Sequence, residues 1–197
     1  VPEAALLDEG WLTDLRTAAA GAVAARHLAP RTVEAIGIVG AGIQARMQLD
    51  LLRHVTRCRR AIVWARDAVK ARAFAVEGFQ IDVASSIADL AAHCNLIVTT
   101  TPARAALVPA EVVRPGTHIT AIGADSPGKQ ELDARLFARA HVLCVDARKQ
   151  CFEHGEAVHA LRDGHATPER FVELGEVVAQ PALGRTREDQ ITICDLT

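Results

Sequence analysis

The sequence predicts an α/β fold with a doubly wound, mostly parallel sheet and helices on both of its faces. Short apolar runs alternate with helix-forming segments about five times along the chain, which is typical of parallel strands joined by helices. One of these runs leads directly into a glycine-rich turn and then a helical segment. Half of the 197 residues are apolar, which is enough for a sizeable core.

The first half of the chain contains four of the expected strands, each an apolar run bounded by turn or cap residues. These strands are expected at 35–39, 61–65, 81–83 and 96–100. A helix at 13–28 precedes them, with Thr13 as a plausible N-cap and Pro30 beyond its end. Further helices are expected at 43–55, 67–76 and 87–93. Asp67 and Ser86 are the expected caps of the last two.

The second half continues the alternation and then changes character. Strands are expected at 118–122 and 141–145, and helices at 132–139, 148–160 and 167–178. A polar stretch over 180–190 is followed by an apolar segment at which the chain stops. Because the chain also begins without Met, we expect it to be a piece of a longer protein.

Composition narrows the class of protein. The formal net charge is −2, so there is no basic excess to neutralise nucleic-acid phosphates or a membrane surface. No apolar run reaches the roughly 18 residues that span a bilayer, and the N-terminus lacks the layout of a signal peptide. The five cysteines are odd in number and contain no Cys-x-x-Cys pair, which favours reduced thiols in a cytoplasmic protein. His154 and His159 lack metal-ligand spacing, so no metal site is expected.

The residues from Gly40 to Ala45 predict a dinucleotide-binding turn. They match the pattern Gly-x-Gly-x-x-Gly/Ala through Gly40, Ala41, Gly42, Ile43, Gln44 and Ala45. Alone this pattern is weak, but here a buried strand precedes it and a helix follows. Gly40 permits the tight turn, Gly42 lets the backbone approach a pyrophosphate, and Ala45 is small enough for the helix to pack on the strand. We therefore expect a Rossmann domain that binds NAD or NADP.

The end of the second strand bears on the choice of cofactor. NAD-preferring sites usually place an acid there, but Ala65 stands at that position and Arg66 follows it. Arg66 could receive a 2′-phosphate, which favours NADP. The alternative is that Arg66 is solvated and Asp67 only caps the next helix.

Two further motifs follow strands whose carboxyl ends would face the cofactor. The first contains Thr100 and Thr101, whose hydroxyls could meet the cofactor, although threonine is also common in strands. The second runs from Gly123 to Leu132 and carries Asp125 and Lys129. Asp125 could exchange a proton with an amine or a water. The alternative is a Pro-Gly turn with a helix-capping aspartate.

These motifs resemble the ornithine cyclodeaminase/mu-crystallin family over nearly the whole chain and in the same order. The resemblance rests on four segments: 12–19, the loop 40–45 with its Gln44, Gly123-Ala124-Asp125 with Pro127-Gly128-Lys129, and the C-terminal stretches 173–177 and 184–192. It implies a Rossmann domain plus a substrate and dimerisation domain. Residues 1–32 would be a helical entry segment from the latter, 33–179 the dinucleotide-binding domain, and 180–197 the start of the return to the mostly absent substrate domain.

The resemblance also implies roles for particular residues. Arg16, otherwise an unremarkable solvated helix residue, would bind the substrate carboxylate. Asp125 would be the catalytic acid/base. Lys129 and the backbone at Ala121, Ile122 and Gly123 would line the cofactor, with Thr100 or Thr101 nearby.

The implied activity is that of an NAD(P)-dependent enzyme acting on a small amino acid or cyclic imine, and the implied assembly is a homodimer. Ornithine cyclodeamination leads: hydride leaves the α-carbon, the side-chain amine attacks the imine, ammonia departs and the hydride returns. The alternatives are a cyclic imino acid or ketimine reductase, an alanine dehydrogenase, and a mu-crystallin-like binding protein without catalysis. The absence of a clear acid after the second strand leans slightly toward a reductase that uses NADP.

Overall fold

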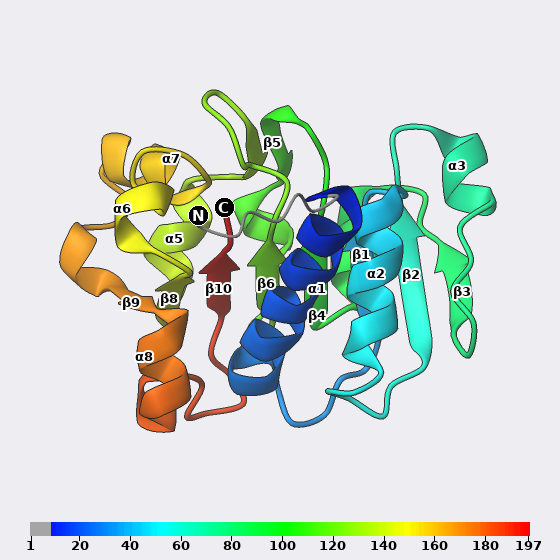
Figure 1. Cartoon of the computed structure of the whole chain (residues 1–197), viewed down its shortest axis with the longest axis horizontal. Helices are drawn as coiled ribbons and strands as arrows, with labels where there is room; N and C mark the ends of the chain where they lie inside the picture. The colour runs from blue at the N-terminus through cyan, green and yellow to red at the C-terminus, as the bar shows by residue number, and fades with distance from the viewer. Residues whose placement is uncertain (1–8) are drawn as a thin grey trace, which may run out of the picture.

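The computed structural model describes residues 9–197 and is built around one parallel sheet (Figure 1). Eight strands lie in the order β3-β2-β1-β4-β6-β10-β8-β9. Their bounds are β1 Ile36–Val39, β2 Arg60–Trp64, β3 Gln80–Val83, β4 Leu96–Thr99, β6 His118–Ala121, β8 Val142–Val145, β9 Phe171–Glu173 and β10 Thr192–Asp195. Two more strands, β5 Arg104–Val108 and β7 Gln130–Leu132, pair with each other in a separate small sheet. The predicted doubly wound α/β class is confirmed.

Helices cover both faces of the large sheet, as the alternation of side chains along its strands requires. Their bounds are α1 Glu9–Leu28, α2 Ile43–Leu52, α3 Ala68–Arg72, α4 Ile87–His93, α5 Arg135–Arg139, α6 Arg148–Cys151, α7 Ala157–Arg162 and α8 Leu174–Ala179. Three short 3-10 turns complete the elements at Ala110–Val112, Pro168–Arg170 and Pro181–Leu183. The described residues contain no helix that is both long and apolar enough to cross a membrane.

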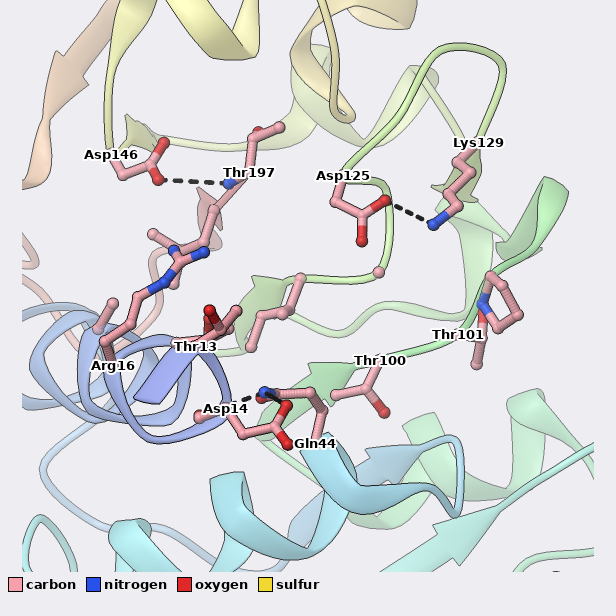
Figure 2. A pocket seen from close by; sticks show the side chains of 16 residues that line it. Thr13, Asp14, Arg16, Gln44, Thr100, Thr101, Asp125, Lys129, Asp146 and Thr197 are labelled. Carbon is pink, nitrogen blue, oxygen red and sulfur yellow. Dashed lines mark hydrogen bonds and ion pairs between the residues drawn. The ribbon is translucent and has the colours of Figure 1, made fainter. Parts of the chain in front are cut away.

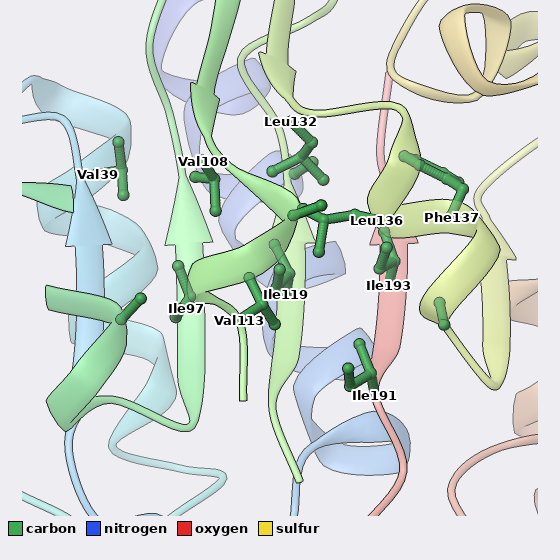
Figure 3. Close-up of a cluster of buried hydrophobic side chains, with 14 of the residues drawn as sticks. Val39, Ile97, Val108, Val113, Ile119, Leu132, Leu136, Phe137, Ile191 and Ile193 are labelled. Carbon is green, nitrogen blue, oxygen red and sulfur yellow. The ribbon is translucent and has the colours of Figure 1, made fainter. Parts of the chain in front are cut away.

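The core has two layers, one on each face of the sheet. Ile36 and Ile38 of β1 belong to the layer under α1, α2 and α8, whereas Val39 belongs to the layer under α4 and α5. Figure 3 shows the second layer, in which Ile97, Ile119 and Ile193 point from adjacent strands toward the same helices and loops. Period-two side chains from a continuous apolar strand thus fill both layers.

The strand order reverses between β1 and β4. β1 connects through α2 to β2 on one side, and the chain then crosses back to place β4 on the other side of β1. The loops that leave the carboxyl ends of these two strands therefore part in opposite directions. In open α/β sheets this switch point is where ligands bind.

The last strand lies in the middle of the large sheet. β10 lies between β6 and β8 and is parallel to both. Ile193 and Cys194 are completely buried there. Residues 192–195 therefore complete the large sheet, while the division of the chain into domains at residues 32 and 179 stays a prediction.

The three helices expected in the second half of the chain are shorter or divided. The segment 148–160 forms α6 and α7, separated by a turn in which Gly155 has φ +86°. In the segment 167–178, residues Phe171–Glu173 instead form β9 against β8, and α8 begins with a capping box between Glu173 and Glu176. In the segment 132–139, Leu132 ends β7 and the helix begins only at Arg135. Strand pairing with distant segments overrides local helical preference in the last two cases.

Candidate active site

The loop from β1 to α2 has the shape expected for binding a phosphate. Gly40 has φ +119°, and a Cβ there would lie 2.5 Å from Oγ1 of Thr100. Gly42 is the N-cap of α2 and offers no side chain to the amides of the first helical turn. A Cβ on Gly42 would meet nothing within 4 Å. Ala45, on the inner side of α2, is fully buried. The first turn of α2 therefore presents its amides toward open space, where an anion fits.

That open space belongs to a cleft of about 660 Å³ between the ends of β1, β2 and β4. Gly40, Ala41, Gly42 and Ile43 line one wall, and Trp64, Arg66, Thr100 and Thr101 are among the residues that line the rest. The glycine cradle, the helix N-terminus and the volume together fit a dinucleotide. The residues present thus fit the cofactor that the loop predicts.

Arg66 and Asp67 take different roles at the end of β2. Oδ1 of Asp67 accepts hydrogen bonds from the amides of Val69 and Lys70, at 2.9 and 3.3 Å, and so caps α3. Arg66 is exposed and lines the cleft together with Lys70. The capping carboxylate is thereby occupied, and two cations face the cleft at this end.

A second, smaller pocket of about 290 Å³ adjoins this cleft. Thr100, Thr101 and Pro102 line both spaces. The pocket brings together Arg16 of α1, Gln44 of α2, and Asp125 and Lys129 of the loop after β6. Figure 2 shows these side chains around one hollow, although Arg16 and Asp125 lie more than a hundred residues apart in the sequence.

Asp125 faces the pocket as a carboxylate held by two neighbours. Its Oδ1 accepts hydrogen bonds from Nζ of Lys129 at 2.5 Å and from Oγ of Ser126 at 2.6 Å. Its side chain is 55% exposed, whereas that of Lys129 is 20% exposed. Partial burial acts to raise the pKa of Asp125, but the bonds from Lys129 and Ser126 outweigh it and hold the pKa below its ordinary value. Asp125 is therefore charged at neutral pH and able to accept a proton.

Arg16 approaches the pocket from the opposite side. Its side chain is exposed, and it makes no hydrogen bond or ion pair with the other described residues. In Figure 2 the guanidinium points into the space beside Asp146 and Thr197. A guanidinium without a carboxylate partner at the rim of a pocket suits a bidentate bond to a ligand carboxylate.

Gln44 lies on the pocket side of the phosphate loop, where it contacts α1. Its Nε2 donates to Oδ1 of Asp14 at 2.8 Å and to the Asp14 carbonyl at 3.2 Å. Its Oε1 is buried without a hydrogen-bond partner among the described residues. Gln44 thus joins α2 to α1 through its Nε2, while its Oε1 remains without a hydrogen-bond donor among the described residues.

The backbone after β6 divides between core and pocket. Ala121 is buried in the core and lines neither space. Ile122 and Gly123 do line the smaller pocket. A Cβ on Gly123 would lie 2.1 Å from the carbonyl oxygen of Thr101, so only glycine allows these two loops to approach so closely.

The sequence interpretation overlooked the part of Glu131. This residue is completely buried on β7, and its carboxylate accepts hydrogen bonds from both loops that face the pocket. The sequence shows an acid next to the apolar Leu132. Its neighbours in sequence do not indicate which hydrogen-bond donors this acid meets in the fold. Asp146, Leu196 and Thr197, at the ends of β8 and β10, also line the pocket and were not expected.

The cysteines and possible metal ligands form no further centre. All five cysteines are free thiols, four of them buried and Cys58 partly exposed. Among residues 9–197, no three His, Cys, Asp or Glu side chains gather closely enough to hold a metal ion.

Comparisons with known proteins show the family and the fold of this chain. The sequence model of the ornithine cyclodeaminase/mu-crystallin family matches residues 2–197. An uncharacterised cyclodeaminase of Sinorhizobium fredii is 44% identical over 201 residues, which cover 99% of this chain and 61% of that protein. The chain thus spans about three fifths of the length of this curated relative.

Two solved structures share the fold closely. An archaeal alanine dehydrogenase dimer with bound NAD has a TM-score of 0.88 and 38% identity, covering 96% of this chain and 60% of its own. The Δ1-pyrroline-2-carboxylate reductase of Thermococcus litoralis, in complex with NADH and L-proline, has a TM-score of 0.89 and 28% identity. It covers 95% of this chain and 60% of its own. Both similarities cover nearly the whole chain.

Proposed function

The chain belongs to the ornithine cyclodeaminase/mu-crystallin family, and from this we propose that it functions in an NAD(P)-dependent enzyme of amino-acid metabolism. The observation that carries the proposal is the junction of two spaces. A cleft that fits a dinucleotide opens at Thr100 and Thr101 into a pocket that holds Arg16 and Asp125. An unpaired cation and a charged carboxylate thus line one pocket beside the place for a nicotinamide.

The residues of this chain divide the work as follows. Arg16 binds the carboxylate of an amino or imino acid and so fixes its α-carbon near the cleft. Asp125 accepts a proton from the substrate amine or from water and later returns it. Lys129 keeps Asp125 charged between these steps. The bound nicotinamide supplies the chemistry of hydride transfer to or from the α-carbon.

Cyclodeamination of ornithine or a similar diamino acid is the leading activity. Reduction of cyclic imino acids or ketimines, or dehydrogenation of alanine, is the second candidate. It is favoured by the similarity to an alanine dehydrogenase and a pyrroline-2-carboxylate reductase. A mu-crystallin-like binder without catalysis is the non-enzymatic alternative, and the presence of both Arg16 and Asp125 speaks against it.

An assay on the chain, and on any longer protein that carries it, separates these activities. Ornithine is supplied with NAD, and a cyclic imino acid with NADPH. Ammonia release without net cofactor reduction identifies a cyclodeaminase, whereas NADPH consumption identifies a reductase. No reaction in either arm, nor with alanine and NAD, while the cofactor binds, identifies the non-catalytic binding protein.

Replacing Asp125 tests the site itself. In Asp125→Asn, turnover is expected to fall by about 10²- to 10⁴-fold, because the amide cannot exchange the proton. Cofactor affinity is expected to stay unchanged. Asp82→Asn, which alters an exposed aspartate paired with Arg60 far from the pocket, is the matched control. Wild-type turnover in Asp125→Asn would exclude this assignment.

Within the nicotinamide cofactors, we propose a preference for NADP. Asp67 is engaged in capping α3, and Arg66 and Lys70 line the cleft at the end of β2. Two cations there favour a 2′-phosphate over a bare ribose. Arg66→Ala is expected to lower the affinity ratio of NADPH to NADH about tenfold, measured by titration calorimetry. An unchanged affinity ratio would show that Arg66 does not distinguish NADPH from NADH.

Assembly and location follow the same reasoning. A homodimer is supported by the dimeric state of the similar alanine dehydrogenase, and light scattering of the purified protein tests it. Free thiols at all five cysteines support a reducing compartment, hence the cytoplasm.

A further inference from the structure

One buried carboxylate lies between the two loops that form the junction of the cleft and the pocket. Oε1 of Glu131 accepts the amide of Thr101 at 2.5 Å. Its Oε2 accepts the hydroxyl of Thr99 at 2.6 Å and the amide of Gly123 at 2.9 Å. A single side chain thus bonds the loop after β4 and the loop after β6.

These two loops approach each other more closely than ordinary side chains allow. A Cβ on Gly123 would lie 2.1 Å from the oxygen and 2.6 Å from the nitrogen of Thr101. Both strands end at this point, so the amides of Thr101 and Gly123 receive no carbonyl partner from the ladder. The Glu131 carboxylate supplies their acceptors, and its two oxygens fix the spacing of the loops.

The position of Glu131 is itself fixed from behind. Its backbone amide donates to Oε1 of Glu156 at 2.6 Å, and the amide of Leu132 donates to Oε2 of Glu156 at 3.0 Å. Glu131 has no exposed surface, and burial raises the pKa of its carboxyl. Burying a carboxylate is costly, and in this place the cost is offset by bonds to the pocket loops rather than by an ion pair.

We propose that Glu131 is a positioning residue for the nicotinamide half of the cofactor. Thr101 lines both spaces and Gly123 lines the smaller pocket, so the spacing between them sets the shape of the pocket wall next to the cleft. The adenosine and phosphate half instead contacts the glycine loop and the end of β2, which Glu131 does not touch. This inference rests on the proposed dinucleotide function. It predicts that Glu131 affects the binding of the nicotinamide half of the cofactor but not that of the adenosine and phosphate half.

The test compares two ligands that share the adenosine diphosphate and ribose but differ in the nicotinamide. The affinities of NADH and ADP-ribose are measured by calorimetry on the wild type and on Glu131→Gln. The amide has only one acceptor oxygen, so at least one loop amide loses its partner. NADH affinity is expected to fall about tenfold, while ADP-ribose affinity stays unchanged.

Two further variants keep the test decisive. Glu156→Gln alters a buried carboxylate that bonds the β7 backbone behind Glu131 but neither pocket loop. It is expected to lower the melting temperature and to shift the ratio of the two affinities by less than Glu131→Gln does. Thr99→Val removes one of the three donors to Glu131 with little change in shape. It is expected to shift the ratio in the same direction by less, and it serves if Glu131→Gln fails to fold.

The outcomes are distinct from those that test the proposed function. If the wild type binds neither of these ligands nor NADPH, the dinucleotide function fails. If the wild type binds both, and Glu131→Gln or Thr99→Val weakens both equally or neither, the positioning role is wrong and Glu131 serves only the fold.

Discussion

Gly40 and Gly42 stand two residues apart in one loop, but they are glycine for different reasons. Gly40 has a positive φ and packs against Thr100, so both conformation and space exclude a side chain. Gly42 has φ −85° and open space where a Cβ would lie. The fold therefore permits alanine at 42, and the reason for glycine there lies in the ligand.

This difference predicts that a substitution at Gly42 changes cofactor affinity without changing the stability of the fold. Gly42→Ala is expected to leave the free energy of unfolding within about 0.5 kcal/mol of the wild type, because the new methyl group meets no atom of the chain. The same methyl group enters the space for the pyrophosphate and is expected to weaken NAD(P)H binding at least about tenfold. Denaturant unfolding and titration calorimetry measure the two effects.

Gly175 provides the matched control. It lies in the first turn of α8, and a Cβ there also meets nothing within 4 Å. Gly175→Ala is expected to affect neither cofactor binding nor folding adversely. Equal loss of binding in both variants, or none in Gly42→Ala, would contradict the assignment of the loop.

At the scale of elements, the contact between α1 and α2 decides where Arg16 lies. Gln48 is buried, and its Nε2 donates to the carbonyl of Thr17 at 3.1 Å. Gly21 on α1 leaves room for the same side chain, since a Cβ there would lie 2.1 Å from Oε1 of Gln48. Together with the Gln44–Asp14 bonds, this contact holds α1 against the phosphate-loop helix.

Substitutions at this contact are expected to be non-additive. Gly21→Ala should destabilise the fold by about 1–3 kcal/mol through overpacking. Gln48→Ala removes the obstacle, so the double variant should be more stable than the sum of the two single effects predicts. Urea unfolding of the four proteins gives the coupling energy. Simple additivity would show that the helices adjust their distance freely.

At the scale of the whole molecule, buried acids gather at the carboxyl end of the sheet. Asp195 of β10 is almost completely buried and accepts the amide of Ala157 at 2.8 Å. Burial raises its pKa to about 7, and burial also raises the pKa of Glu156 well above its ordinary value. These groups join the last strand, α7 and β7 beneath the pocket.

The raised pKa of Asp195 predicts a specific pH dependence. An acid with a raised folded pKa binds more protons in the folded state, so its contribution to stability is complete below the unfolded value near 4 and is lost as pH rises toward about 7. Relative to Asp195→Asn, the wild type is expected to lose up to about 1.4 kcal/mol per pH unit between pH 5 and 7. Unfolding at several pH values measures this difference.

The comparison with the variant is needed because His118 acts in the opposite direction. Burial lowers its pKa to about 3, so His118 adds stability as pH rises toward 6.5. This contribution is common to both proteins and cancels in the difference. A difference that stays constant from pH 5 to 7 would mean that Asp195 is charged throughout.

Local patterns were sufficient for much of the fold. The strand around Ile38, the turn at Gly40–Gly42 and the cap of α4 at Ser86 depend on neighbours in sequence, and all lie where the sequence predicted. β5, β9 and the central place of β10 depend on pairing with distant strands. A four-residue apolar segment carries no information about which neighbour it will pair with, so these features were missed or misassigned.

The sequence by itself predicted the dinucleotide loop, the class of fold and Asp125 as a candidate, and its resemblance to the family added Arg16. The tertiary structure decided that these two side chains share one pocket, that Lys129 holds Asp125 charged, and that Glu131 joins the loops beside it. The physical reason is the range of the interactions. A turn and a cap are fixed by bonds between near neighbours, whereas a pocket is fixed by side chains that only the packing of the sheet brings together.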